Sequence, residues 1–348
     1  MKRKIAVLLT VALIGASLFG CGGTSEGTAK DAQEETEAAG SEETSAEAEE
    51  TSSEGPNIVF IAKGVADYWS VVAGGFESAA EENGLKGTVI YPSEETTSKQ
   101  VDTMYDIINS KPDAIVLAPI DADPLSVPCK AAMDAGIPVV LVDTGISTED
   151  YVTAFATDNK AAGAATAEKM AEELGGKGKV YIFAGSPAST SGSARVEGFT
   201  EYMEENCPDI EVLGCLYSDS NMALATSQTV DVLTANPDLA GIFAADETRS
   251  SGCSAALIQL GKENDIIVAG FDANSDTVAL MEQGVINFMT VQQPYMMGYM
   301  GYNAALAALN GEQQERTTLD TGCTVVTQEN MNEPEMQKIL FPLDHMND

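Results

Sequence analysis

Short apolar runs alternate with longer amphipathic stretches from Asn57 onward, and this alternation predicts strands and helices in turn. The first strand-like runs lie at 58–62, 88–91, 114–118 and 138–142, and helical stretches near 69–83, 99–110 and 125–135 separate them. Short apolar strands that alternate with helices form parallel sheets covered on both faces. We therefore expect an α/β unit here.

A second series of the same kind follows. Its strand-like runs lie at 180–184, 212–217, 241–245, 266–271 and 287–291, and its helical stretches lie near 160–174, 191–206, 222–235, 249–261 and 294–310. The two series also echo each other, because 110–117 and 235–243 each carry a helix end, a Pro-Asp turn and an apolar strand. One such echo indicates two similar doubly wound halves, and a cleft between them is a natural ligand site.

The first 56 residues read as targeting sequence and tether. Lys2, Arg3 and Lys4 precede a short apolar run that ends at Leu18-Phe19-Gly20-Cys21. This ending resembles the lipobox of bacterial lipoproteins, which implies a signal peptide over 1–20 and a lipid on Cys21; the alternative is an ordinary secretory signal with an incidental cysteine. Residues 21–56 are acidic and nearly free of large apolar side chains, so we expect a disordered tether.

The formal net charge is −36. The basic leader contributes +3 and residues 24–56 contribute −10, which leaves −29 on the body, 57–348. A body of this charge repels phosphate backbones and anionic headgroups, which argues against nucleic-acid partners and limits membrane contact to the anchor. No apolar run after the leader reaches the roughly 18 residues that a membrane helix needs.

Catalytic and metal-binding patterns are sparse. His345 is the only histidine, and the cysteines after Cys21 are odd in number and lack CxxC spacing. We therefore predict no enzyme, no metal and no cofactor, with the cysteines serving mainly as small apolar side chains. Two weaker alternatives remain: a phosphate cradle at the Ser-rich loop 189–193, and an acid/base pair formed by Asp143 and Asp246.

Polar residues stand directly after several of the predicted strands. They are Asp143, Asp246, Asp272 and Gln292, and Lys63 follows the first strand in the same way. Each aspartate taken alone has a second interpretation as a helix N-cap. Since ligands bind outside the carboxyl ends of parallel strands, the recurrence of the pattern predicts convergence on one cleft.

The chemistry of these residues suits an uncharged ligand that carries many hydroxyls. Carboxylates accept strongly from hydroxyl groups, Lys63 and Arg195 add donors, and the rings of Tyr68 and Trp69 suit the apolar faces of a sugar. One of the two adjacent rings could instead fill the core. A choline-like amine is the alternative ligand, because other aromatic residues are available for a cage.

The body resembles the ribose-binding-protein-like solute-binding proteins of sugar ABC importers over about 57–330. The resemblance is carried by VFIAKGVADYWSVVAGGFESAAEENG, DAIVLAPID, GIPVVLVDT, VEGF, NPDLAGIFAADE and VAGFDA. It implies the type I periplasmic-binding-protein fold, with two doubly wound lobes joined by three crossings near 153–157, 292–294 and 319–322. The lobes would comprise 57–154 with 293–320, and 155–292 with 321–348.

The resemblance also assigns roles to particular residues. It implies that Tyr68 and Trp69 stack on the sugar and that Asp143, Asp272 and Gln292 bind its hydroxyls. The sequence departs from the family where Thr144 replaces an arginine, where Asp246 replaces an asparagine, and where Arg195 is the nearest match to another arginine. Lys63 and the aromatic pair look like members that bind other polyhydroxylated ligands, including the furanosyl signal autoinducer-2.

These observations together predict a solute-binding protein, anchored by lipid on the outer face of the cell membrane. It would capture a monosaccharide or small polyol as a monomer and deliver it to an ABC permease. Two alternatives remain open: a receptor that presents its closed form to a membrane sensor, and a secreted sugar-processing enzyme. The predicted ligand-binding residues are Lys63, Tyr68, Trp69, Asp143, Arg195, Asp246, Asp272 and Gln292.

Overall fold

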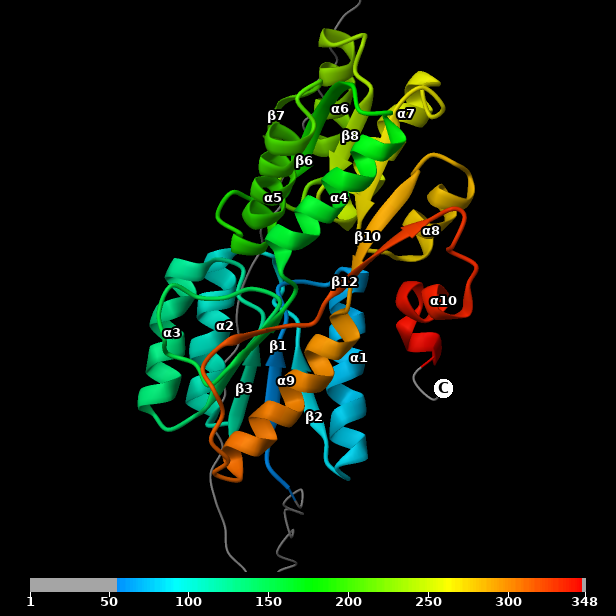
Figure 1. The fold of residues 1–348 in the computed structure, drawn as a ribbon. Coiled ribbons are helices and arrows are strands. Elements are labelled where there is room, and N and C mark those ends of the chain that lie inside the picture. Colours follow the sequence, from blue (N-terminus) through cyan, green and yellow to red (C-terminus); the bar gives the residue numbers. More distant parts are fainter. Residues whose placement is uncertain (1–54, 346–348) are drawn as a thin grey trace, which may run out of the picture. The chain divides into compact units, whose positions relative to one another are not determined.

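The computed structural model describes residues 55–345, and its strands form two six-stranded sheets (Figure 1). The first sheet has the spatial order β11 (Thr318–Asp320), β5 (Ala154–Ala156), β4 (Val139–Val142), β3 (Ala114–Leu117), β1 (Ile58–Ile61) and β2 (Gly87–Ile90). The second has the order β12 (Cys323–Thr327), β10 (Phe288–Gln292), β9 (Ile267–Phe271), β8 (Gly241–Ala244), β6 (Gly178–Ala184) and β7 (Ile210–Tyr217).

Neighbouring strands run parallel, except for one pair at the edge of the second sheet. In the first sheet Ile58 of β1 lies opposite Gly87 of β2 on one side and Ala114 of β3 on the other. β12 instead pairs antiparallel with β10 along all five of its residues. The predicted fold class, two doubly wound parallel-sheet lobes, is thus confirmed, with one antiparallel edge strand that the sequence did not predict.

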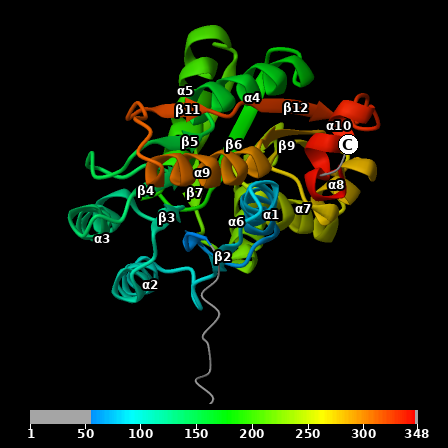
Figure 2. The same cartoon turned by 90° about the horizontal axis from the view of Figure 1, so that it is seen from below.

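Helices cover both faces of each sheet (Figure 2). The first lobe, defined as the first sheet with its helices, contains α1 (Asp67–Glu82), α2 (Thr97–Ser110), α3 (Ala122–Asp134) and α9 (Pro294–Leu309). The second lobe, defined likewise, contains α4 (Asn159–Glu173), α5 (Thr190–Asn206), α6 (Met222–Ala235), α7 (Glu247–Leu260), α8 (Ser275–Glu282) and α10 (Pro334–Leu340), and is followed by a 3-10 turn, η1 (Pro342–His345).

Alternation along the strands sorts side chains between these two layers. Phe60 of β1 packs in a cluster with residues of α1 and α9, whereas Val59 and Ile61 pack with residues of α2 and α3. In the second lobe Ile242 joins the α6–α8 layer, and Phe243 joins the α4–α5 layer. Strands buried on both faces read as continuous apolar runs, which explains why these strands were recognisable in the sequence.

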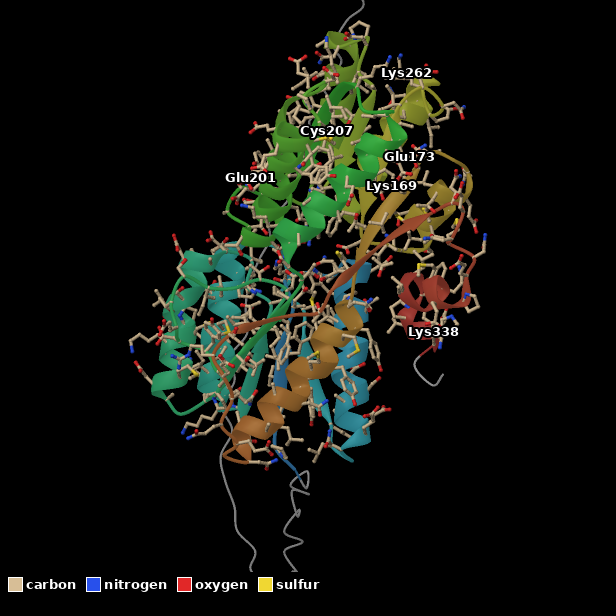
Figure 3. The ribbon with its side chains drawn as sticks, viewed as in Figure 1. Lys169, Glu173, Glu201, Cys207, Lys262 and Lys338 are labelled. Carbon is tan, nitrogen blue, oxygen red and sulfur yellow. The ribbon has the colours of Figure 1, made fainter. Side chains whose placement is uncertain are left out.

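The chain passes from one sheet to the other three times: between β5 and β6, between β10 and α9, and between β11 and β12. All described residues belong to a single unit of the chain. Polar residues lie on the outer helix surfaces, where Lys169 of α4 pairs with Glu173 one turn later at 2.8 Å, both labelled in Figure 3. The carboxyl ends of the parallel strands of both sheets are left to form the walls of one cavity.

The predictions about lipidation, cysteines and membrane helices concern residues that the structure describes only in part. The signal peptide, Cys21 and nearly all of the tether lie outside the described residues. Within 55–345 the five cysteines are unpaired; Cys129 and Cys253 are buried, and the others are half-buried. Burial raises the pKa of the thiols of Cys129 and Cys253 to about 12, so both behave as apolar side chains. Among the described helices, none combines the length and apolar character that crossing a bilayer requires.

Each lobe contains a helix pair whose close packing depends on glycine. A Cβ at Gly298 of α9 would overlap the carbonyl oxygen of Val72 in α1, and one at Gly75 of α1 would overlap that of Tyr295. In the second lobe Gly163 of α4 and Gly198 of α5 stand in the same relation to backbone atoms of the facing helix. The obstacle is backbone rather than a flexible side chain, so an added methyl group must push the helices apart.

Replacing Gly298 with Ala should therefore destabilise the protein by about 1–3 kcal/mol, although alanine is the better helix former by about 1 kcal/mol. Urea denaturation of the purified protein measures the change. Gly145→Ala is the matched control, because open space surrounds that position and its φ is not positive. Equal stability of Gly298→Ala and the wild type would refute the packing argument.

Candidate functional site

Loops at the strand ends of both lobes enclose a cavity of about 490 Å³. All eight residues predicted for the site line this cavity: Lys63, Tyr68, Trp69, Asp143, Arg195, Asp246, Asp272 and Gln292. The two lobes also touch beside it, where the hydroxyls of Thr144 and Ser191 lie 3.3 Å apart. The sequence pattern thus identified side chains that the fold brings together.

Lys63 and Asp143 form the polar centre of the first-lobe wall. The Lys63 ammonium donates to the Asp143 carboxylate at 2.6 Å and to the Thr144 hydroxyl at 2.5 Å. The Tyr68 hydroxyl donates to the other oxygen of Asp143 at 2.9 Å. Both charged side chains are about nine-tenths buried or more, so each needs the other to offset the loss of hydration.

The pKa values of this group follow from burial and from the nearby charges. Burial alone would raise the pKa of Asp143, but the Lys63 ammonium, Arg195 and the hydrogen bond from Thr144 hold it below its usual range. Burial, together with the charges of Asp143 and Asp272, raises the pKa of Tyr68 well above its ordinary value. Asp143 is therefore an ionised acceptor, and Tyr68 keeps its proton as a donor.

Arg195 and Asp272 form the corresponding centre in the second lobe. The Arg195 guanidinium lies over the Phe271 ring at 3.9 Å and donates to the Asn159 side chain at 2.7 Å. One of its terminal nitrogens lies 4.0 Å from the Asp272 carboxylate. Gln292 donates to Asp272 through its side-chain amide at 2.8 Å and through its backbone N–H at 3.2 Å.

Asp143 and Asp272 hold equivalent backbone positions in the two lobes. Each directly follows a strand, has a left-handed φ (66° and 62°), and donates its N–H to a neighbouring strand, to Phe155 and Thr290 respectively. A left-handed residue other than glycine costs about 1–3 kcal/mol, and such residues gather at ligand sites. The conformation turns each carboxylate from the sheet into the cavity.

Asp272 differs from Asp143 in the direction of its pKa shift. Burial raises the pKa of Asp272 to about 6, because Arg195 and the hydrogen bonds from Gln292 only partly compensate and the charge of Asp143 adds to the shift. The side-chain oxygen of Gln292 is buried and has no partner among the described residues. This part of the wall therefore offers acceptors that have spare capacity for donors.

The adjacent aromatic residues Tyr68 and Trp69 pack at the first-lobe core and also line the cavity. Trp69 is 6% exposed and belongs to the first-lobe core cluster, and Tyr68 packs against that cluster. Their rings meet edge to face with centroids 4.9 Å apart, and the Lys63 ammonium lies 5.4 Å from the centroid of Trp69. Since both rings also line the cavity, each is at once core and wall.

Asp246 is both a helix N-cap and a residue of the cavity wall, the two interpretations that the sequence left open. Its carboxylate caps α7 by accepting from the backbone N–H of Arg249 at 3.0 Å, and it also lines the cavity. Asp143, by contrast, precedes a turn and caps none of the described helices. Because each is paired with a cation, Lys63 or Arg249, both suit the role of acceptor better than that of general acid.

Sequence reasoning missed several polar residues of this region, among them Arg249, Glu247 and Asn159. Arg249 lines the cavity and forms an ion pair with Asp246. Glu247 also lines the cavity and accepts a hydrogen bond from Asn274. Asn159 accepts a hydrogen bond from Arg195. Burial, with the charges of neighbouring acids, raises the pKa of Glu247 to about 7. The Asp-x-x-Arg spacing at the start of α7 was a usable signal for Arg249, whereas Asn159 offered none.

The chain is similar in sequence and in structure to known binding proteins. A sequence model of the family described as "Periplasmic binding protein domain" matches residues 58–313. The Bacillus subtilis (strain 168) ribose import binding protein is 28% identical over 243 residues, which are 70% of this chain and 78% of the relative.

Two solved structures from Agrobacterium vitis, both ABC transporter solute-binding proteins, superpose on 82% of this chain and 99% of their own. One carries bound D-fucose (TM-score 0.77, 37% identity), and the other carries α-D-tagatopyranose (TM-score 0.78, 32% identity).

The raised pKa of Asp272 predicts a pH-dependent stability. In the window from about pH 4 to about pH 6 the folded state holds a proton that the unfolded state has released, so stability falls as the pH rises through it. Relative to an Asp272→Asn variant, the ligand-free wild type should lose roughly 1–3 kcal/mol of unfolding free energy between pH 4 and pH 7.

Urea denaturation at several pH values measures this difference. Asp209→Asn, which changes an exposed aspartate outside the cavity, is the control and should track the wild type. A constant difference between wild type and Asp272→Asn across the window would contradict the assignment.

Proposed function

The chain belongs to the family of periplasmic binding protein domains, and from this premise we propose that it captures a monosaccharide or small polyol and delivers it to an ABC permease. The observation that carries the proposal is the convergence of anchored acceptors from both lobes, above all Asp143 and Asp272, on one cavity next to Trp69. The solute-binding relatives with bound D-fucose and tagatopyranose support it.

A sugar satisfies the particular needs of this wall. Its hydroxyls donate to Asp143, Asp246 and Asp272 and to the unpartnered oxygen of Gln292, and the C–H face of its ring lies against Trp69. The three cations that line the cavity each lie within 4.0 Å of a carboxylate, which leaves Glu95, Asp219 and Glu247 in excess. A phosphorylated sugar would meet a net negative cavity, so we propose an uncharged ligand.

Capture then follows from the placement of the acceptors on two lobes. We propose that the predicted units move about the three chain passages, with all of β5 kept in the first lobe: 57–156 with 293–320 forms one unit and 157–292 with 321–345 forms the other. A ligand held by Asp143 from one side and by Asp272 from the other binds the closed arrangement better than the open one, and this difference drives closure. Closure removes water and strengthens each hydrogen bond.

Replacing Asp272 with Ala tests the assignment. Loss of a charged acceptor should weaken sugar binding about 10- to 100-fold, because hydrogen bonds to charged groups are worth about 1.5–3 kcal/mol. Thermal shifts against D-ribose, D-arabinose, D-fucose, D-galactose, D-tagatose and myo-inositol identify the ligand, and calorimetry compares the variant with the wild type.

Asp209→Ala, outside the cavity, is the control and should bind as the wild type does. Unchanged affinity in Asp272→Ala would remove this residue from the site, and a wild type that binds no sugar or polyol would refute the function.

We propose that the mature protein is held on the extracytoplasmic face by lipid on Cys21, with 22–56 as the tether. The basic leader, the apolar run and the cysteine occur in the order that lipidation requires. A Cys21→Ser change should therefore release the protein into the soluble fraction of bacterial cells or into the medium. Cell fractionation with immunoblotting measures this, with Cys323→Ser as the control. Membrane retention of Cys21→Ser equal to that of wild type would exclude the anchor.

A further inference from the structure

The Asp246–Arg249 pair on the second-lobe wall has a geometry that goes beyond helix capping. Arg249 donates from Nε to one carboxylate oxygen of Asp246 at 2.6 Å, and its terminal nitrogen Nη2 forms an ion pair with the other oxygen at 2.5 Å. The backbone N–H of Arg249 donates to the first oxygen as well. One residue thus contacts both oxygens through three nitrogens, which fixes the plane of the carboxylate.

The surroundings of the pair are built to hold it. Arg249 is 6% exposed, and its other terminal nitrogen lies 3.4 Å from the buried Ser218 hydroxyl. Gly185, which directly follows β6, leaves room for the ion pair. A Cβ at this position would stand 3.2 Å from Arg249 Nη2 and 3.3 Å from Asp246 Oδ2. A bidentate arginine in such a pocket is more rigid than a surface ion pair, which exchanges freely with water.

The two oxygens of Asp246 have different tasks. Oδ1 accepts from both the backbone and Nε of Arg249, so the cap and the salt bridge use up its capacity. Among the described residues Oδ2 contacts only Nη2, and the Asp246 side chain, which lines the cavity, is 25% exposed. A carboxylate oxygen accepts two hydrogen bonds, so Oδ2 keeps one position open to the cavity.

From these contacts we infer that Arg249 is a positioning residue of the ligand site: it orients Asp246 so that Oδ2 accepts a hydrogen bond from one particular hydroxyl of the sugar. The inference rests on the proposed sugar-binding function. Asp246 stands beside the acid Glu247 and lines the same cavity as Asp272, so a further negative charge without a bound cation is unfavourable here. Arg249 removes that cost without contacting the ligand itself.

The test uses the full-length protein and calorimetry with D-ribose and D-galactose, each beside its 2-deoxy analogue, and with D-fucose as the 6-deoxy form of galactose. Arg249→Met should weaken binding of the better sugar about 10- to 100-fold. It should also shrink the wild-type preference for that sugar over the one deoxy analogue that lacks the hydroxyl facing Asp246. Lys179→Met, which removes a cation from an exposed ion pair of the same lobe, should bind within twofold of wild type.

Two further variants separate positioning from a merely structural role. In Asp246→Asn/Arg249→Met the neutral amide needs no cation, so affinity should recover about tenfold over Arg249→Met alone. Arg249→Lys keeps the charge and the fold but not the bidentate contact, and we expect about tenfold weaker binding. Melting curves establish that each variant is folded.

Wild-type affinity in Arg249→Lys and Arg249→Met, or no recovery in the double variant, would overturn the inference while the proposed function stands. Failure of the wild type to bind any sugar of the wider panel would instead overturn the function and the inference together.

Discussion

The ion pair of Lys63 and Asp143, 2.6 Å long and almost wholly removed from solvent, limits what the cavity can hold. Two charges of this kind are expensive to bury, and they persist because each is the other's partner and because Tyr68 and Thr144 also hydrogen-bond to the pair. Among the described residues Oδ1 of Asp143 accepts only from Tyr68, so it keeps one acceptor position for a ligand. The same solution recurs across the cavity in Arg195 with Asp272 and in Arg249 with Asp246. Each cation on the cavity wall is thus paired with a carboxylate of the protein. The hydrogen-bond positions that remain free on the wall are mainly acceptors, which suit a molecule rich in hydroxyls.

The repeated architecture explains how two lobes produce one site. In each lobe a parallel sheet ends in an aspartate with left-handed backbone, Asp143 or Asp272, whose carboxylate turns into the space beyond the strands. In each lobe a pair of helices packs so closely that glycine is required at the contact. Neither lobe alone encloses a ligand, because the aromatic residues belong to the first and most of the carboxylates to the second. Recognition therefore depends on both lobes together.

Much of this organisation could be predicted from the sequence. Strands such as Val139–Val142 are buried on both faces, so their apolar runs stand out, and the polar residues that follow several of these runs could be read from the sequence. The residues of β11 are all exposed, and β5 and β11 are only three residues long, so no apolar pattern distinguished these strands from the crossings predicted there. The helix α8 is eight residues long, and its signal was the capping box of Asn274 and Thr277 rather than periodicity.

Distances and partners in the site could not be predicted in this way. Arg249 was overlooked because spacing along α7 shows which residues share a face of the helix but not whether that face meets a cavity. Asn159 acts only through Arg195, which is 36 residues away in the sequence. The raised pKa of Asp272 depends on burial and on Asp143 in the other lobe, and both are products of the assembled fold.

A crystal structure of the protein with its tightest-binding monosaccharide tests the central claim most directly. We expect one sugar inside the cavity, with hydroxyls within about 3.2 Å of Asp143 and Asp272 and a ring face against Trp69. A sugar bound outside the cavity, or one held by carboxylates of a single lobe, would contradict it.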